Sequence, residues 1–189
     1  TINLTNVNEA PTGADTTVTI TEDTAHTFTT ANFGFSDVDA GDSLSAVRID
    51  TLPSAGSLTL SGLAVTAGQV VTVADITAGN LVFTPAAAAN GAGYASLTFS
   101  VRDANNAYDA APNTLTVNVT AVNDAPTDLT LSANTIAENA ANGTVVGTVT
   151  GTDPDTGDTK TYSFTDSAGG RFAINSSTGE ITVADGSLL

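Results

Sequence analysis

Two short acidic runs are the residues best placed to do chemistry in this 189-residue chain. The first is SDVDAGDSL at residues 36–44, and the second is TDPDTGDTK at residues 152–160. Each contains the pattern Asp-x-Asp-x-Gly-Asp, which places three carboxylates within six positions. These carboxylates repel one another unless a cation neutralises them. Carboxylate, amide and backbone carbonyl oxygens are the ligands that calcium takes, so the runs are candidate calcium loops.

The local geometry of the runs fits one ion. In an extended segment alternate side chains point to the same side, so both carboxylates of an Asp-x-Asp pair can face one cation. The glycine that follows allows a turn. An EF-hand is excluded, because the twelfth position of its loop carries a bidentate Glu, and here that position is Arg48 or Phe164. A single run could equally be a polar turn, and we assign Asp42 and Asp158 to shaping that turn.

The overall charge limits the partners. The formal net charge is −16, from 20 acidic and 4 basic residues. Nucleic acids and anionic lipids are recognised through Lys and Arg, so the chain is predicted to bind neither. No apolar run approaches the roughly 18–20 residues of a membrane span, so no membrane insertion is expected. There is no cysteine for disulfide or thiolate chemistry.

The elements that must position the acidic runs are short strands. Alternating runs rich in β-branched residues recur along the chain: TTVTIT (16–21), LSAVRI (44–49), SLTL (57–60), LAVT (63–66), QVVTV (69–73), NLVFT (80–84), ASLTFSVR (95–102) and NTLTVNV (113–119). This period of two predicts half-buried antiparallel strands. Evenly spaced short strands of this kind indicate an all-β fold of antiparallel β-sandwiches.

The chain repeats itself about every 115 residues. VNEAPT (7–12) recurs as VNDAPT (122–127), and the acidic patterns begin at residues 37 and 153. That period matches a whole sandwich and is too long for a solenoid unit. TINLTNVN (1–8) also matches TVNVTAVN (116–123). We therefore expect a window from a longer array: residues 1–7 are the last strand of a preceding repeat, residues 8–124 a complete repeat, and residues 125–189 the N-terminal part of a second, truncated repeat.

These features together carry a family resemblance. The Asn-Asp-Ala-Pro linker, an early Glu after the first strand of each repeat, the Asp-x-Asp loop and the stretch GGRFAINSSTGEITVADGSLL (169–189) occur in the order seen in cadherins. The sequence resembles the cadherin-like repeats of very large secreted bacterial adhesins, including the VCBS and repeats-in-toxin types. The resemblance implies a cadherin-like, immunoglobulin-type Greek key, an extracellular location at a bacterial cell surface, and calcium ions between consecutive repeats.

The resemblance also implies the calcium ligands. At the junction of the two repeats they are Glu22, Asn123, Asp124, Asp153 and Asp155. At the upstream junction they are Asn8, Glu9, Asp37 and Asp39, and Asp103 completes that site. Glu138 would face a third junction.

Catalysis finds little support in the sequence. There is no cysteine, one histidine and no Gly-x-Ser-x-Gly elbow, although a carboxylate pair for glycoside hydrolysis remains open. The predicted function is a non-enzymatic, calcium-rigidified extender of a surface adhesin, acting in calcium-dependent cell adhesion or biofilm attachment. The alternative is a carbohydrate- or protein-binding β-sandwich module of a secreted protein, although aromatic residues for stacking on sugars make up only 5% of the chain. Expected partners are calcium and the neighbouring repeats; a homophilic partner and a glycan or protein ligand stay open.

Overall fold

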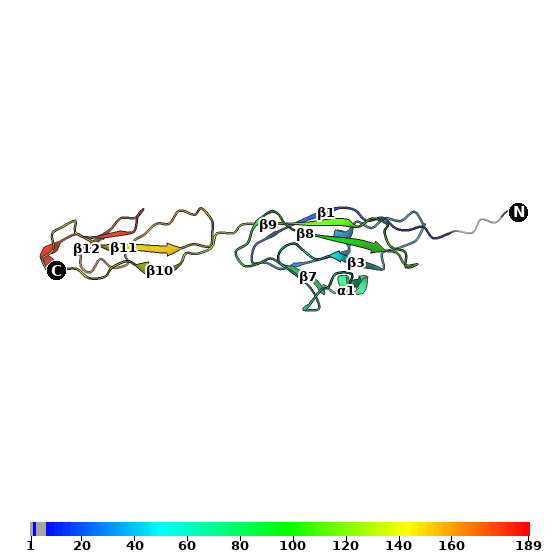
Figure 1. Ribbon diagram of the computed structural model, residues 1–189, viewed down its shortest axis with the longest axis horizontal. Helices are drawn as coiled ribbons and strands as arrows, with labels where there is room; N and C mark the ends of the chain where they lie inside the picture. The colour runs from blue at the N-terminus through cyan, green and yellow to red at the C-terminus, as the bar shows by residue number, and fades with distance from the viewer. Residues whose placement is uncertain (1, 3–6) are drawn as a thin grey trace. The chain divides into compact units, whose positions relative to one another are not determined.

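The computed structural model describes residue 2 and residues 7–189, and the chain divides into two compact units, Thr1–Val122 and Asn123–Leu189 (Figure 1). Of residues 1–7, the predicted last strand of a preceding repeat, only Ile2 and Val7 are therefore described. The division of the chain into one complete and one truncated repeat stays a prediction. No helix in the described part of the chain is long and apolar enough to cross a membrane.

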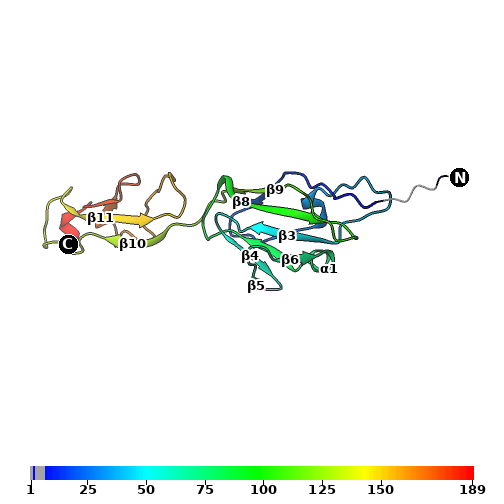
Figure 2. The same cartoon turned by 45° about the vertical axis from the view of Figure 1, so that its right-hand side comes forward.

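The first unit is a sandwich of two sheets (Figures 1 and 2). One sheet has the order β1-β9-β8-β3-β6, with bounds β1 Thr16–Thr21, β9 Asn113–Thr120, β8 Gly91–Arg102, β3 Ala46–Thr51 and β6 Val70–Thr72. The other has the order β2-β7-β4-β5, with bounds β2 His26–Thr27, β7 Leu81–Thr84, β4 Ser57–Leu60 and β5 Leu63–Ala64. A 3-10 turn, Thr30–Phe33, and a short helix α1, Val73–Thr77, complete the unit.

The core of the first unit follows from the period of two. In β9, Leu115, Val117 and Val119 are at most 3% exposed, whereas the residues between them are partly exposed. The inward side chains of both sheets meet in one hydrophobic cluster, which includes the edge-to-face pair of Phe33 and Phe99. The predicted all-β fold is confirmed.

One strand pair departs from the antiparallel pattern and determines which residues share an end of the unit. Strand β1 runs parallel to β9, from Thr16 opposite Leu115 to Thr21 opposite Thr120. Strand β8 runs antiparallel to β9. The residues that follow β1 therefore lie at the same end as those that follow β9, and the residues that follow β8 lie at the opposite end.

The second unit contains a single antiparallel sheet in the order β10-β11-β13-β12. Its elements are β10 Thr127–Leu131, β11 Val145–Thr152, β12 Phe172–Ile174, β13 Glu180–Val183 and a 3-10 turn, Gly186–Leu188. Its buried hydrophobic residues are Ile181 and Val183. Because so few apolar side chains are removed from water, this unit gains less from burial than the first.

Replacing Phe99 should destabilise the first unit. The side chain is 0% exposed, and its ring lies 5.0 Å from that of Phe33. Phe99→Ala leaves a cavity, which should cost about 3–5 kcal/mol of unfolding free energy. Thermal unfolding followed by circular dichroism tests this, with Leu63→Ala, at a side chain 76% exposed, as the control. Equal melting temperatures for the two variants would contradict the assigned core.

His26 should make the first unit sensitive to mild acid. Its Nε2 atom is shielded from solvent without a hydrogen-bond partner, beside the Phe28 ring at 5.0 Å. Burial lowers the pKa of His26 below its ordinary value, so the unfolded chain takes up the proton more readily. Stability is then lost as the pH falls below the unfolded value of about 6.5. Wild type should lose more melting temperature between pH 7.5 and 5.5 than His26→Leu; equal losses would contradict this role.

Candidate metal sites

Three carboxylates meet at one end of the first unit. Oxygen atoms of Asp37, Asp42 and Asp103 all lie within 4.8 Å of one another. Asp37 and Asp42 belong to the predicted acidic loop, and Asp103 directly follows β8. Asp103 is 0% exposed. A buried carboxylate beside two others requires compensation, from hydrogen bonds or from a cation.

Part of this compensation for Asp103 comes from hydrogen bonds. The backbone N–H of Ala107 donates to one carboxylate oxygen of Asp103 at 2.7 Å. The side-chain amide of Asn8 donates to the other at 2.9 Å. Asn8 and Asp103 are thus brought together although they are 95 positions apart in the sequence.

Four further hydrogen bonds order the acidic loop and the segment that enters the repeat, and one of them, from Glu9 to Asp39, joins the two. Within the loop, the N–H of Asp39 donates to Asp37 Oδ1 at 2.8 Å, and the N–H of Asp42 donates to Asp39 O at 3.1 Å. From the entering segment, the N–H of Glu9 donates to Asp39 Oδ2 at 2.8 Å. The amide of Asn8 also donates to Glu9 O at 3.0 Å. All five predicted ligands of the upstream site therefore belong to one network at this end of the unit.

The second unit repeats these four bonds on its own residues. The N–H of Asp155 donates to Asp153 Oδ1 at 3.0 Å, and the N–H of Asp158 donates to Asp155 O at 3.3 Å. The N–H of Asp124 donates to Asp155 Oδ2 at 2.6 Å, and the amide of Asn123 donates to Asp124 O at 2.9 Å. The two copies of the sequence pattern therefore form the same arrangement of hydrogen bonds.

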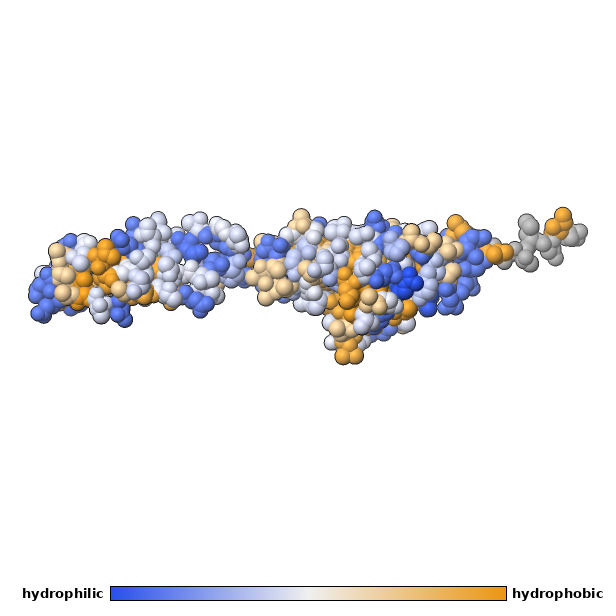
Figure 3. All heavy atoms as spheres, in the orientation of Figure 1, coloured by the Kyte–Doolittle hydropathy of each residue, from blue (hydrophilic) through white to orange (hydrophobic). Residues whose placement is uncertain are grey.

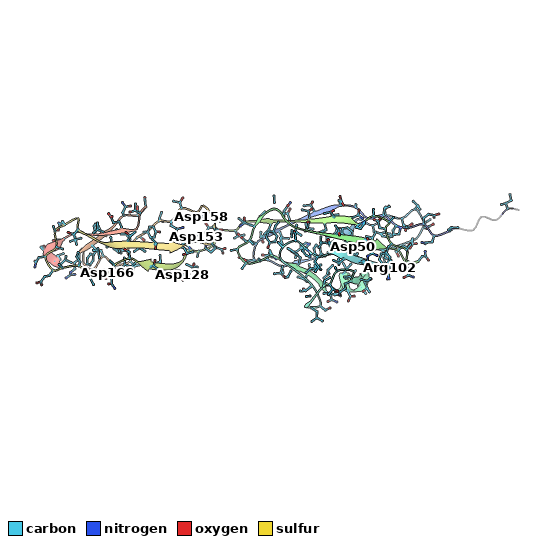
Figure 4. All side chains as sticks on the ribbon, viewed as in Figure 1. Asp50, Arg102, Asp128, Asp153, Asp158 and Asp166 are labelled. Atoms are coloured by element: carbon cyan, nitrogen blue, oxygen red, sulfur yellow. The ribbon has the colours of Figure 1, made fainter. Side chains whose placement is uncertain are left out.

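The carboxylates of the second unit also converge. Oxygen atoms of Asp153, Asp155 and Asp158 lie within 4.8 Å of one another, and Asp153 and Asp158 lie beyond the end of β11 (Figure 4). Asn123 and Asp124 line the same hollow as Asp153 and Asp158. Four of the predicted ligands thus share one end of this unit.

The third Asp of each pattern, Asp42 or Asp158, was not predicted as a ligand. Asp42 does shape the turn, because its Oδ1 accepts hydrogen bonds from Ser43 N–H and Ala104 N–H. Its carboxylate nevertheless joins the acidic group of the first unit, as that of Asp158 does in the second. Asn105 was also missed: its amide bridges Asp42 Oδ2 and Asn8 Oδ1, at 2.9 and 2.6 Å. The recurrence of the third Asp in both runs was the available signal.

Glu22 lies at the other end of the first unit. Its carboxylate accepts hydrogen bonds from the Asn90 amide at 2.9 Å and from the N–H of Val122 at 2.5 Å. These two bonds lower the pKa of Glu22 below its ordinary value, so the group is an anion at neutral pH. Its own N–H donates to Thr120 O at 3.0 Å, a contact that the parallel pairing of β1 and β9 makes possible. Glu22 is therefore held beside the point where the chain leaves the unit.

Glu138 stands apart from these groups. It is exposed in a turn of the second unit and belongs to none of the acidic groups found among the described residues. Its predicted role as a calcium ligand stays a prediction.

The donor set suits a hard cation. In both units it consists of carboxylate, amide and carbonyl oxygens, without thiolate or imidazole, which is the chemistry of calcium and magnesium. Asp37 Oδ2 is shielded from solvent and has no hydrogen-bond partner, so it has a vacant acceptor for an ion. The charge of Asp39, followed by burial, raises the pKa of Glu9 above its ordinary value, as expected where negative charge is in excess. The residues present therefore fit a calcium ion.

Comparisons with known proteins identify the family of the chain. The family model of the cadherin-like domain matches residues 7–120, and that of the cadherin domain matches residues 133–186. The search of curated proteins found no match.

Solved structures support the fold. Mouse cadherin-23 domains EC22–24 are 24% identical with a TM-score of 0.60, over 95% of this chain and 55% of that one. Protocadherin gamma B7 domains 1–4 are 14% identical with a TM-score of 0.58, over 93% and 41%. Human CDH23 domains EC21–23 are 20% identical with a TM-score of 0.54, over 93% and 58%. The chain thus spans about half the length of the solved structures it matches.

The cadherin resemblance predicted from the sequence is therefore confirmed. Domains of this kind are typically non-enzymatic, calcium-dependent adhesion modules. One family model alone covers well over half of the 189 residues, and the chain belongs to the cadherin-like domain family.

Proposed function

We propose that this chain is a calcium-stiffened extender segment of a large secreted adhesin at a bacterial cell surface. In this role it has no enzymatic activity and serves calcium-dependent cell adhesion or biofilm attachment by holding other domains away from the cell. The bacterial source and the adhesin rest on the likeness of the repeats to those of bacterial adhesins. The partners in this proposal are calcium and the neighbouring repeats, with any homophilic, glycan or protein ligand bound elsewhere in the full protein.

One observation carries the proposal: in both units the same backbone hydrogen bond fastens the entering segment to the acidic loop, from Glu9 N–H to Asp39 Oδ2 in the first unit and from Asp124 N–H to Asp155 Oδ2 in the second. A calcium ion bound by the loop carboxylates would add stronger bonds at the same place. It would resist rotation of the entering segment relative to the sandwich that follows. A chain of such repeats would then be stiff when calcium is present and flexible when it is absent.

The proposed ligands are those predicted from the sequence, with two additions. One ion would be held by Asn8, Glu9, Asp37, Asp39 and Asp103, and Asp42 is added to this set. Another would be held by Asn123, Asp124, Asp153 and Asp155, and Asp158 is added. Glu22 is a further proposed ligand, since it is held by the N–H of Val122, the residue directly before Asn123.

Calcium should stabilise the protein. Extracellular calcium modules have dissociation constants of about 10⁻⁴–10⁻³ M. Calcium at tenfold that value contributes about 1.4 kcal/mol per site, or roughly 6–11 °C in melting temperature for a small domain. Melting curves in about 10 mM calcium and in excess chelator test this. Identical curves would sink the metal hypothesis.

Removing two loop charges should abolish the stiffening and leave the first unit folded. Asp153→Asn with Asp155→Asn keeps the hydrogen-bond acceptors but removes the anions a calcium ion needs. Small-angle scattering in calcium should then show a broader distribution of lengths than wild type. The matched control is Asp128→Asn with Asp166→Asn, which removes two acids of the second unit outside the acidic group (Figure 4). If both double variants scatter like wild type, the ion does not control the joint.

A further inference from the structure

One basic side chain lies among the carboxylates of the second unit. Lys160 follows the acidic run directly in sequence, and it lines the same hollow as Asn123, Asp124, Asp153 and Asp158. The acidic group described above therefore has a positive charge at its side. A cation that belongs to the protein itself offsets part of the repulsion between neighbouring carboxylates.

Lys160 is the basic residue that this unit has available for that role. Residues 123–189 contain two basic residues, Lys160 and Arg171. The guanidinium of Arg171 is engaged by the backbone, because its Nε donates to Leu188 O and its Nη1 donates to Ala168 O, both at 2.6 Å. In the described part of the chain, Lys160 forms no ion pair within 4.0 Å. Its charge therefore acts on the acidic group as a whole and not on one carboxylate.

The carbon stem of Lys160 is positioned by apolar side chains. Lys160 also lines a second, mainly apolar hollow of this unit, together with Leu129, Tyr162 and Ile174. Its Cδ lies 3.8 Å from the point that a Cβ atom at Gly151 would occupy. Figure 3 shows apolar side chains at the surface of this unit close to strongly hydrophilic ones. A lysine at such a boundary packs its stem along the apolar surface and keeps its ammonium group in the polar hollow.

The first unit has a leucine at the matching position. The runs at residues 36–44 and 152–160 align without a gap, so Leu44 stands where the second unit has Lys160. Leu44 packs against the hydrophobic core of the first unit. The hollow beside the first acidic loop is lined by acidic, amide and small residues. The two loops therefore share their three aspartates but differ by one positive charge.

We propose that Lys160 is a built-in counter-ion of the second acidic loop and lowers the affinity of that loop for calcium. When no ion is bound, the ammonium group neutralises part of the carboxylate charge. A calcium ion then enters a site with less net negative charge and is repelled by the lysine, so it binds more weakly. The effect on affinity rests on the proposed calcium function, whereas the counter-ion role does not depend on it.

The single charge gives the two loops different calcium thresholds. The first loop, with Leu44, fills at a lower calcium concentration than the second, with Lys160. At a concentration between the two dissociation constants, the first loop is occupied and the second is empty. The residue that follows each acidic run thus sets the calcium concentration at which that loop responds.

Calcium titration of the whole chain, followed by NMR, tests the effect on affinity. The amide signals of Gly41 and Gly157, the glycine of each acidic pattern, report the two loops separately. Lys160→Gln should tighten calcium binding at Gly157 by about threefold to tenfold, because no unit charge opposes the ion, and should leave binding at Gly41 unchanged. Lys160→Arg keeps the charge and is the matched control, with wild-type binding at both glycines. Salt screens charges, so the gain should shrink when the ionic strength rises from about 0.05 to about 0.5 M.

The two glycine signals distinguish failure of this inference from failure of the calcium proposal. If both signals respond to calcium but Lys160→Gln binds at Gly157 as wild type does, the effect on affinity is overturned and calcium binding stands. If neither signal responds in the wild type, calcium binding is overturned, and the effect on affinity with it.

Hydrogen exchange in excess chelator tests the counter-ion role without calcium. Lys160→Gln should exchange the amide hydrogens of residues 153–158 about threefold faster than wild type or more, because the repulsion between the carboxylates is no longer offset. Lys160→Arg should exchange at the wild-type rate. Lys160→Gln is thus expected to loosen the ion-free loop and yet tighten calcium binding, a combination that loss of folding does not produce. Equal exchange rates in all three proteins overturn the counter-ion role.

Discussion

The mutual repulsion of carboxylates is the constraint on which the acidic loop of each unit depends. In each unit three Asp oxygens lie within 4.8 Å of one another, an arrangement that costs free energy unless it is offset. Backbone N–H groups of the loop and of the entering segment supply part of the offset. Some of these donors belong to the acidic loop, and one in each unit belongs to the entering segment. The hydrogen bond that partly neutralises the loop carboxylate therefore also fixes the path of the entering segment. A cation at this position would strengthen a connection that the hydrogen bonds already make.

The parallel pair of β1 and β9 distributes the acidic groups between the two ends of the first unit. It places Glu22 beside Thr120 and Val122, where the chain leaves. The antiparallel turn from β8 to β9 places Asp103 at the opposite end, beside the loop of Asp37 and the entering residue Asn8. One sheet thus carries an anionic side chain at each end, Glu22 at one and Asp103 at the other. In an array of such repeats, each junction could then receive metal ligands from the repeat before it and from the repeat after it.

Much of this could be predicted from the sequence because it rests on short-range patterns. Alternation of β-branched and polar residues predicted the strands of the first unit, and the recurrence of Asp-x-Asp-x-Gly-Asp predicted the acidic loops. What could not be predicted depends on partners distant in sequence. The parallel direction of β1, for example, follows from its pairing with a strand about 100 residues away. Helix α1 is the exception, because it replaces the end of the predicted 69–73 strand through a local contact, in which the Thr72 side chain accepts a hydrogen bond from Asp75 N–H. The role of Asp42 was missed because a turn-forming Asp and a metal-binding Asp look the same in the sequence. Here one carboxylate both accepts the hydrogen bonds of the turn and lies close to Asp37 and Asp103.

The acidic groups of the two units share one hydrogen-bond pattern but are not equivalent. In the first unit the loop carboxylates are joined by Asp103, a fully buried group delivered by β8. In the second unit the third carboxylate is that of Asp158, which is exposed. A buried anion interacts more strongly with a neighbouring ion than an exposed one, since water screens it less. The first site is also built on a sandwich with a continuous core, whereas the second rests on one sheet with two buried apolar residues. An ion that binds at the second site must therefore order more of the surrounding loop. The free-energy cost of that ordering lowers the affinity of the second site for the ion.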